Sequence, residues 1–339
     1  MTHDAEALLA LLGRVRGRRV VVLGDLVSDE FIYGEMKRVY GDVARTSREV
    51  AFGLMLRQRE VHRVPGGGAN AINNLAALGA RPLPFGFVGA DAAGRELRSY
   101  FRRRGVSTSG LQVVRHWNTP VKSRILAGSS HTAAQQVLRL DREPPGHPPA
   151  AAQRRLVAAA RRALKNSDAV LIADYGYGAA SPAVVRALLR GGSRAPVVVD
   201  SRYQVRAYRG VTAVTPSVPE LEEAYLWPNA SDANVVRRLG RRLLKEVRAG
   251  AVLVTRGRQG MLLLQRGGRS VAIPPFGTDQ VVDVTGAGDT VAASFAAALA
   301  AGADFEAAAR LANIAGGLVV RKRGTATVSA AEIRAALSA

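Results

Sequence analysis

The sequence predicts an α/β fold: a doubly wound, mostly parallel sheet with helices on both faces. Apolar runs of four to seven residues alternate with helical patterns along the chain, at residues 20–23, 83–88, 169–173, 196–199, 211–214 and 251–254. Such short, continuous runs are typical of strands that are buried on both faces and covered by the intervening helices. With 339 residues, 47% of them hydrophobic, the chain can bury this core as one domain.

Two segments, approximately residues 30–64 and 112–141, interrupt this alternation. The second contains two strand-like runs, at residues 119–126 and 135–140, joined by small residues. Because neither segment continues the alternation of strand and helix, we expect them to form a small β lid over the mouth of the sheet. The prediction is therefore a single domain over residues 1–339 with a lid built from two separate segments.

A glycine-rich turn, Asp283-Val-Thr-Gly-Ala-Gly-Asp289, precedes a long run of small residues. At the start of a helix, the backbone N–H groups of Gly286, Ala287 and Gly288 can converge on an anion. Asp289, beside them, can accept the proton of an attacking hydroxyl. The pattern indicates a phosphoryl-transfer site. The alternative is an ordinary turn whose aspartate serves only the helix dipole.

A second glycine-rich element, Pro65-Gly-Gly-Gly-Ala-Asn70, precedes a helical pattern that ends at Gly79. Its glycines allow a ligand to approach the backbone, and the Asn70 amide suits sugar hydroxyls. Together with Gly24-Asp25 after the first strand, this order of elements resembles the ribokinase/PfkB family of carbohydrate kinases. The likeness covers nearly the whole chain and is greatest to members that phosphorylate D-glycero-D-manno-heptose 7-phosphate. It also includes the motifs Asp25-Leu-Val-Ser-Asp29, Ala173-Asp174-Tyr-Gly-Tyr-Gly178, Thr215-Pro-Ser-Val-Pro-Glu220 and Gly324-Thr-Ala-Thr-Val-Ser329.

The resemblance implies a ribokinase-like fold and an ATP- and Mg²⁺-dependent kinase acting on the anomeric hydroxyl of the heptose 7-phosphate, with the 1,7-bisphosphate as product. Asp289 would be the base, and residues 286–288 the anion hole. The implied substrate-binding residues are Asp25, Asp29, Gly67, Gly68 and Asn70, with Asp174 near the substrate or the metal. The implied ATP-binding residues are Asp200, Ser217, Thr255, Gly257, Gly260 and Asn313.

The metal sites are less determined by the sequence. Ser217-Val-Pro-Glu220 stands where many relatives have Asn-x-x-Glu, whose glutamate organises hydrated Mg²⁺. Ser-x-x-Glu is also a capping box at a helix start, so two roles stay open for Glu220. Asp283 and Thr285 match positions that bind a monovalent cation such as K⁺ in some relatives, and the sequence leaves open whether this chain uses one.

Three basic residues fall on the strand-like runs of the lid: Lys122, Arg124 and Arg139. Lys122 and Arg124 alternate onto one face, so the three cations could bind the phosphate that the substrate already carries. Alternatively, they are exposed cations that guard a sheet edge. Residues 35–51 depart from the heptose kinase pattern by an apparent short insertion and a missing proline, which leaves the exact sugar open. The resemblance also implies a homodimer formed through the lid.

The net charge of +21 is carried mostly by arginine, since only five of the 48 basic residues are lysines. We interpret the arginines mainly as solvated helix faces that also steer anionic substrates, and specific nucleic-acid binding is not expected. The absence of cysteine excludes disulfides, and the five histidines show no metal-binding spacing. No apolar run reaches the roughly 18 residues of a membrane span, and the N-terminus lacks a signal-peptide pattern, so a cytoplasmic enzyme is expected.

The sequence leaves three functions open as alternatives to a heptose kinase. The first is another sugar or nucleoside kinase of the same fold, similar to ribokinase or fructokinase. The second is a sugar-binding regulator without turnover, and the third is a nucleic-acid-binding protein built on a kinase fold. An adenylyltransferase half, which bifunctional heptose kinases carry, is not expected because the sequence has no His-x-Gly-His motif.

Overall fold

The computed structural model describes residues 3–36, 56–128, 135–228, 232–277 and 280–338. Its main sheet has nine strands in the order β13-β12-β11-β10-β9-β8-β1-β4-β5. Neighbouring strands are parallel except at one edge, where β12 runs antiparallel to both β11 and β13. The strands are β1 (Arg19–Gly24), β4 (Arg81–Gly89), β5 (Leu111–Val114), β8 (Ala169–Asp174), β9 (Val197–Ser201), β10 (Ala213–Val214), β11 (Ala251–Thr255), β12 (Met261–Gln265) and β13 (Ser270–Ile273). This confirms the predicted mostly parallel sheet.

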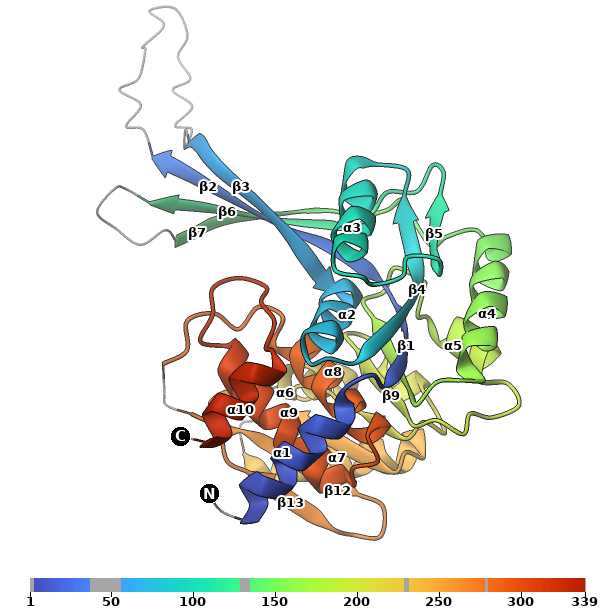
Figure 1. The fold of residues 1–339 in the computed structure, drawn as a ribbon, viewed down its shortest axis with the longest axis vertical. Coiled ribbons are helices and arrows are strands. Elements are labelled where there is room, and N and C mark those ends of the chain that lie inside the picture. Colours follow the sequence, from blue (N-terminus) through green and yellow to red (C-terminus); the bar gives the residue numbers. More distant parts are fainter. Residues whose placement is uncertain (1–2, 37–55, 129–134, 229–231, 278–279, 339) are drawn as a thin grey trace, which may run out of the picture.

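Helices cover both faces of this sheet (Figure 1). One core includes side chains from α1 (His3–Val15), α2 (Gly68–Ala77), α3 (Ala92–Arg103), α8 (Ala287–Ala300), α9 (Phe305–Val319) and α10 (Ala330–Ser338). The other includes α4 (Ala150–Leu164), α5 (Pro182–Leu189), α6 (Val218–Tyr225), α7 (Ala233–Val247) and the short 3₁₀ turn η1 (Val205–Ala207).

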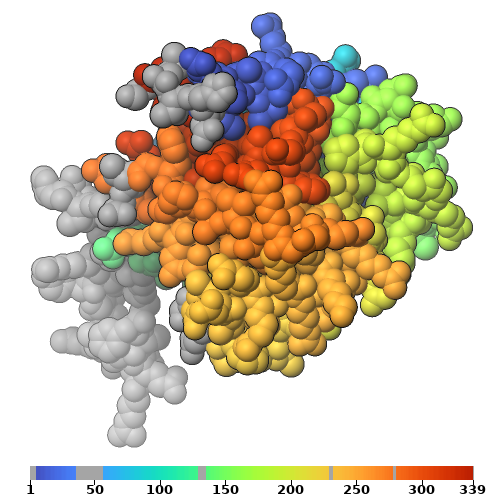
Figure 2. Space-filling model, turned by 90° about the horizontal axis from the view of Figure 1, so that it is seen from below, coloured from blue at the N-terminus to red at the C-terminus, as the bar shows by residue number. Residues whose placement is uncertain are grey.

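The central strand β1 shows why the sheet needs helices on both sides. Val20 and Val22 belong to the first core, whereas Val21 and Leu23 belong to the second, and all four are fully buried. Successive side chains of a strand point to opposite faces, so an uninterrupted apolar run requires two apolar layers. The first and last helices, α1 and α10, pack together, and Figure 2 shows the blue N-terminal part beside the red C-terminal part.

A separate four-stranded sheet forms the lid, in the order β3-β2-β6-β7. Its strands are β2 (Leu26–Met36), β3 (Leu56–Gly67), β6 (Val121–Gly128) and β7 (Gln135–Arg142), and it projects from one end of the main body (Figure 1). β5 lies inside the segment expected to belong to the lid but pairs with β4 in the main sheet. The second lid segment thus begins at Val121. Most of the apparent insertion at residues 35–51 lies outside the described residues.

The register of the lid strands separates its side chains onto two faces. Asp29 lies opposite Lys122, and Phe31 lies opposite Arg124. The next strand continues these rows, with Asp141 opposite Lys122 and Arg139 opposite Arg124. The alternate residues form an apolar row on the other face, made of Val61, Ile32, Ile125 and Leu138. No helix in the described part of the chain is long and apolar enough to cross a membrane.

Candidate active site

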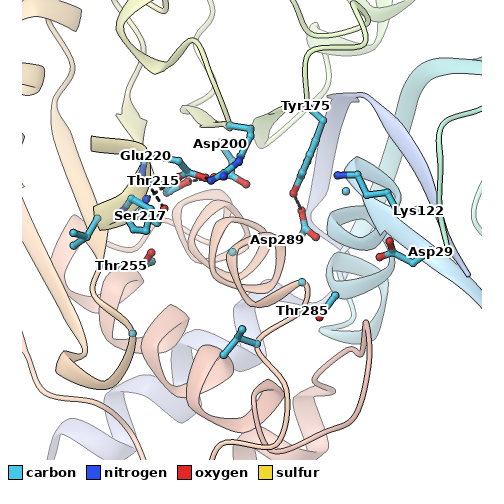
Figure 3. A pocket seen from close by; sticks show the side chains of 18 of the residues that line it. Asp29, Lys122, Tyr175, Asp200, Thr215, Ser217, Glu220, Thr255, Thr285 and Asp289 are labelled. Atoms are coloured by element: carbon cyan, nitrogen blue, oxygen red, sulfur yellow. Dashed lines mark hydrogen bonds and ion pairs between the residues drawn. The ribbon is translucent and has the colours of Figure 1, made fainter. Parts of the chain in front are cut away.

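A cavity of about 700 Å³ lies between the lid and the carboxyl ends of the main strands (Figure 3). In open α/β sheets this edge is where ligands bind, because the loops that follow the strands converge there. Thirteen of the residues proposed from the sequence line it: Asp29, Gly67, Lys122, Arg124, Asp200, Ser217, Glu220, Thr255, Gly257, Thr285, Gly286, Gly288 and Asp289. Residues that are more than 200 positions apart in the chain thus share one site.

Asp289 lies in the first turn of α8 and is 3% exposed. Its carboxylate accepts a hydrogen bond from the Asn70 amide at 3.0 Å and a short one from the phenol of Tyr175. Burial raises the pKa of Asp289 to about 7, although these two hydrogen bonds oppose the rise by favouring the charged form. A carboxylate with such a pKa can accept a proton near neutral pH.

The turn before α8 adopts the conformation that its glycines allow. Gly286 has φ 77°, and a Cβ there would come 2.6 Å from the Asn70 amide nitrogen. The N–H of Ala287 is less available to an anion, because it donates to the Val284 carbonyl at 3.2 Å. Gly286 and Gly288 line the cavity, so they are the better candidates of the three predicted donors.

The lid contributes one ion pair and one cation to the cavity. Asp29 accepts hydrogen bonds from Arg124 at 2.8 Å and from the Thr325 hydroxyl at 2.6 Å, and its side chain is 6% exposed. The Lys122 ammonium lies 5.2 Å from the centroid of the Tyr175 ring and forms no hydrogen bond or ion pair within the described residues. Burial, followed by the neighbouring Arg139, lowers the pKa of Lys122.

Arg139 does not line the cavity formed by the described residues. It is exposed on β7, and its guanidinium binds both carboxylate oxygens of Asp141 at 2.8 and 2.7 Å. Asp141 lies two residues further along the strand and therefore projects from the same face. Arg139 differs from Arg124 in lying outside this cavity, so its contact with the substrate phosphate stays a prediction.

Four further residues expected at the substrate, Asp25, Gly68, Asn70 and Asp174, are buried and do not line the cavity. Asp25 is 2% exposed and accepts hydrogen bonds from the backbone N–H groups of Tyr175, Tyr177 and Ala179 at 2.8 to 3.0 Å. Burial raises its pKa to about 6, and nearby Asp174 adds to the rise. The Asp25 carboxylate therefore holds the loop after β8, and the geometry does not support the contact with sugar hydroxyls.

Asp174 and Gly68 have comparable roles in holding the wall together. Asp174 accepts hydrogen bonds from the hydroxyls of Ser201 and Tyr208 at 2.8 and 2.6 Å. The N–H of Gly68 donates to the Asp25 carbonyl, which a Cβ on Gly68 would approach to 2.9 Å. Asn70 is likewise committed, since its amide nitrogen also lies 3.3 Å from the Gly286 carbonyl. Its amide nitrogen contacts Asp289 and the glycine-rich turn instead of being free for a sugar.

Two carboxylates, Asp200 and Glu220, line the opposite end of the cavity (Figure 3). Burial raises the pKa of Asp200 well above its usual range, and the charges of Glu220 and Asp289 raise it further. Glu220 completes a capping box with Ser217, whose N–H donates to it at 2.8 Å, and it pairs with Arg202 at 3.2 Å. The capping role of Glu220 is therefore present. In the described part of the chain, no group of three or more His, Asp or Glu side chains could hold a metal ion.

A narrower, mainly apolar pocket adjoins the cavity and shares Thr255, Gly257, Val284 and Gly288 with it. Residues predicted at the nucleotide, Gly260 and Asn313, lie here together with Ala287. Gly260 follows the 3₁₀ turn η2 (Gly257–Gln259) and has φ 74°; a Cβ there would overlap the Ile273 carbonyl. The Asn313 amide donates to the Pro274 carbonyl at 2.8 Å, so it fixes a wall of the pocket.

Asp283 lies in neither pocket of the described residues. It accepts hydrogen bonds from both the N–H and the hydroxyl of Thr285, and from the N–H of Gly324. The hydrogen bonds outweigh the effect of burial and lower the pKa of Asp283. Asp283 thus ties the glycine-rich turn to the loop that contains Thr325, which contacts the lid residue Asp29.

Side chains that line or support the cavity but were not proposed from the sequence include Tyr175, Arg202, Thr215 and Thr325. One signal for Tyr175 was present, since it directly follows Asp174 at the end of a buried strand, where ligand-contacting residues are expected. Its contact with Asp289 spans 114 positions of sequence and has no local pattern that could reveal it.

Comparisons with known proteins agree with this geometry. Residues 31–332 match the model of the pfkB family carbohydrate kinases. Among curated proteins, the chain is 38% identical over 331 residues to the bifunctional protein HldE of Caulobacter sp. strain K31, covering 97% of this chain and 64% of that protein. It is 37% identical over 327 residues to the bifunctional protein HldE of Geobacter metallireducens, covering 96% and 64%. The chain thus spans about 64% of the length of these relatives.

Two solved structures share the fold at low sequence identity. Arabidopsis thaliana ribokinase complexed with ribose and ATP has a TM-score of 0.72 and 20% identity, covering 96% of this chain and 99% of that one. Phosphofructokinase-2 from Escherichia coli, in complex with potassium, has a TM-score of 0.72 and 18% identity, covering 95% and 100%. The fold is therefore ribokinase-like, and by its sequence match the chain belongs to the pfkB family of carbohydrate kinases.

Proposed function

We propose that this protein transfers the γ-phosphoryl group of ATP to the anomeric hydroxyl of D-glycero-D-manno-heptose 7-phosphate and so forms the 1,7-bisphosphate. The observation that carries the proposal is the buried Asp289 beside the glycine turn at the start of α8. The sequence resemblance to heptose 7-phosphate kinases supports the choice of sugar, as do the matches to bifunctional relatives over nearly the whole chain.

In the proposed phosphoryl transfer, a proton leaves the sugar hydroxyl and negative charge develops on the phosphoryl oxygens. Asp289 takes the proton of the anomeric hydroxyl while that oxygen attacks the γ-phosphorus and the bond to the β-phosphate oxygen breaks. Gly286 and Gly288 line the cavity at a helix N-terminus, where their N–H groups would stabilise negative charge on the phosphoryl oxygens. The lid excludes water, which limits hydrolysis of ATP.

Lys122 and Arg124 are our candidates for binding the phosphate at position 7 of the sugar. Both line the cavity from one face of β6, and Lys122 has no anionic partner in direct contact within the described residues. A phosphate would supply that partner. Asp29, held by Arg124, is the nearest candidate for the sugar hydroxyls because it lines the same end of the cavity.

ATP would lie along the rest of the cavity, with its base in the apolar pocket beside Asn313 and Val320. Asp200 and Glu220 would hold hydrated Mg²⁺ on the phosphates. They suit this role because Mg²⁺ keeps several waters and needs only one or two carboxylates. The raised pKa of Asp200 fits a site where a cation would relieve the repulsion between carboxylates. When bound, the ion neutralises phosphate charge.

We further propose that the lid pairs with a second copy of the chain. The row of Val61, Ile32, Ile125 and Leu138 faces away from the cavity, and Leu138 is 55% exposed. An exposed apolar sheet face is a common site of association. Sedimentation of wild type and Leu138→Asp would test this: a dimer that the variant loses supports the proposal, and a wild-type monomer contradicts it.

The test of the proposed activity is an ATP-consumption screen against phosphorylated and free sugars. We expect the heptose 7-phosphate to be used with kcat/KM at least about a hundredfold above the free heptose, because a buried charged contact is lost with the phosphate. Equal use of both sugars would favour a ribokinase- or fructokinase-like enzyme. Sugar binding without ATP consumption would favour a regulator.

A further inference from the structure

The second oxygen of the Asp289 carboxylate is occupied by a phenol that the proposed chemistry does not explain. Asn70 donates to Oδ2, and the Tyr175 hydroxyl donates to Oδ1. Figure 3 shows the Tyr175 ring reaching from the loop after β8 to the carboxylate, with Lys122 beside it. Both oxygens of the base are therefore held by protein donors that come from different parts of the fold.

When Asp289 is ionised, the phenol is the donor in this contact. Burial raises the pKa of Tyr175 well above 10, and the charge of Asp289 raises it further, so the hydroxyl keeps its proton at neutral pH. A donor to a carboxylate stabilises the ionised form of that carboxylate. Burial favours the protonated form of Asp289, which cannot accept a proton. The hydrogen bond from Tyr175 opposes this protonation.

The surroundings fix Tyr175 in this position. Asp25 accepts the N–H of Tyr175 at 2.9 Å and holds two further N–H groups of the same loop. On one side the ring packs on Gly67, where an added Cβ would come within 3.2 Å of two ring carbons. Because the backbone and the ring are both held, removal of the hydroxyl alone should leave the ring in place.

We propose that Tyr175 is a positioning residue of the phosphoryl-transfer site, whose hydroxyl keeps the Asp289 carboxylate ionised and aimed into the cavity. The inference deepens the proposed kinase function and rests on Asp289 as its base. Asp25 acts one step further away, since it places the loop that carries Tyr175.

Tyr175→Phe tests this because it removes only the hydroxyl. We expect the pKa of Asp289, followed by ¹³C NMR of the carboxyl carbons and assigned with Asp289→Asn, to rise by about one pH unit. The acid limb of the kcat profile should move upward by the same amount. Activity at pH 6 should then fall by up to about tenfold, whereas activity at pH 9 should nearly recover.

Tyr177→Phe is the matched control, because that phenol belongs to the same loop but donates to Glu143 on the exposed side. It should leave both the carboxyl titration and the kcat profile unchanged. The inference is overturned if Tyr175→Phe titrates like wild type, or if its kcat falls by the same factor at every pH. The carboxyl titration needs no substrate, so it still reports on Tyr175 if no sugar is phosphorylated, an outcome that would count against the proposed function alone.

Discussion

The two sheets of this protein are stabilised in different ways. Each strand of the main sheet from β8 to β11 is buried, and helices cover both of its faces. In the lid, every residue of β7 is exposed, whereas residues 26–31 of β2 are buried where that strand leaves the main body, and Asp29 adds a polar contact with Thr325. The active-site cavity lies between the two. The proposed base, Asp289, therefore comes from the buried main body, whereas the cations proposed to select the substrate come from the more exposed lid.

The largest effect on kcat is expected at Asp289, which α8 of the main body contributes to the cavity. Asp289→Asn should lower kcat by about two to four decades, because it deletes the proton acceptor without adding bulk. ATP affinity, measured by calorimetry, should remain close to that of wild type. More than a tenth of wild-type kcat in the variant would remove Asp289 from the role of base.

Substitutions in the two sheets should change the free energy of unfolding by different amounts. Leu171→Ala, in the fully buried strand β8, should lower the free energy of unfolding by about 2 to 5 kcal/mol, because it leaves a cavity in the core. Leu138→Ala, in the exposed lid strand, should cost less than about 0.5 kcal/mol at low protein concentration. Urea unfolding measures both. Equal costs would contradict the contrast between the sheets, and a cost for Leu138 that grows with concentration would indicate the proposed dimer.

Within the lid, substrate selection should depend on the cavity-lining cations. Lys122→Met should raise KM for the heptose 7-phosphate by about ten- to a hundredfold and leave KM for ATP nearly unchanged, since a remote phosphate contact contributes largely uniform binding. Arg139→Ala is the comparison, and it should change KM by less than about threefold because Arg139 does not line the cavity and its exposed ion pair with Asp141 contributes little. If Arg139→Ala is the more damaging variant, the phosphate binds at the outer edge of the lid.

The pH dependence of kcat within one unit of neutrality gives the smallest effect and reports on the burial of Asp289. Because burial raises the pKa of Asp289 to about 7, the base is protonated below that pH and ionised above it. We therefore expect kcat to rise with pH through about 7 and to fall about tenfold per unit below it. Steady-state rates at saturating substrates measure this. A profile that is flat between pH 5 and 8 would mean that the base is not buried during turnover.

The structural elements that could be predicted best from the sequence are those that depend on local patterns of residues. The buried strands follow from apolar runs, and the capping boxes at Ser217 and Ser329 follow from residues three positions apart. The glycine turn at Gly286 is equally local. The roles of Asp25 and Asn70 could not be predicted, because their carboxylate and amide are used by backbone and side chains more than 140 positions away. Arg139 could not be placed for a different reason. Its partner Asp141 is only two residues away, but their contact can be inferred only when both are known to lie on one face of a strand.

Asp25 has a further consequence, because it is the only residue between β1 and β2. Its N–H bonds to the Ala173 carbonyl, its carbonyl accepts from Gly68, and its carboxylate holds the loop of Tyr175. A tilt of the lid strand relative to the main sheet would change the backbone torsions next to this residue. Asp25 therefore attaches both the lid strand and the loop of Tyr175, the partner of Asp289, to the main sheet at a single residue.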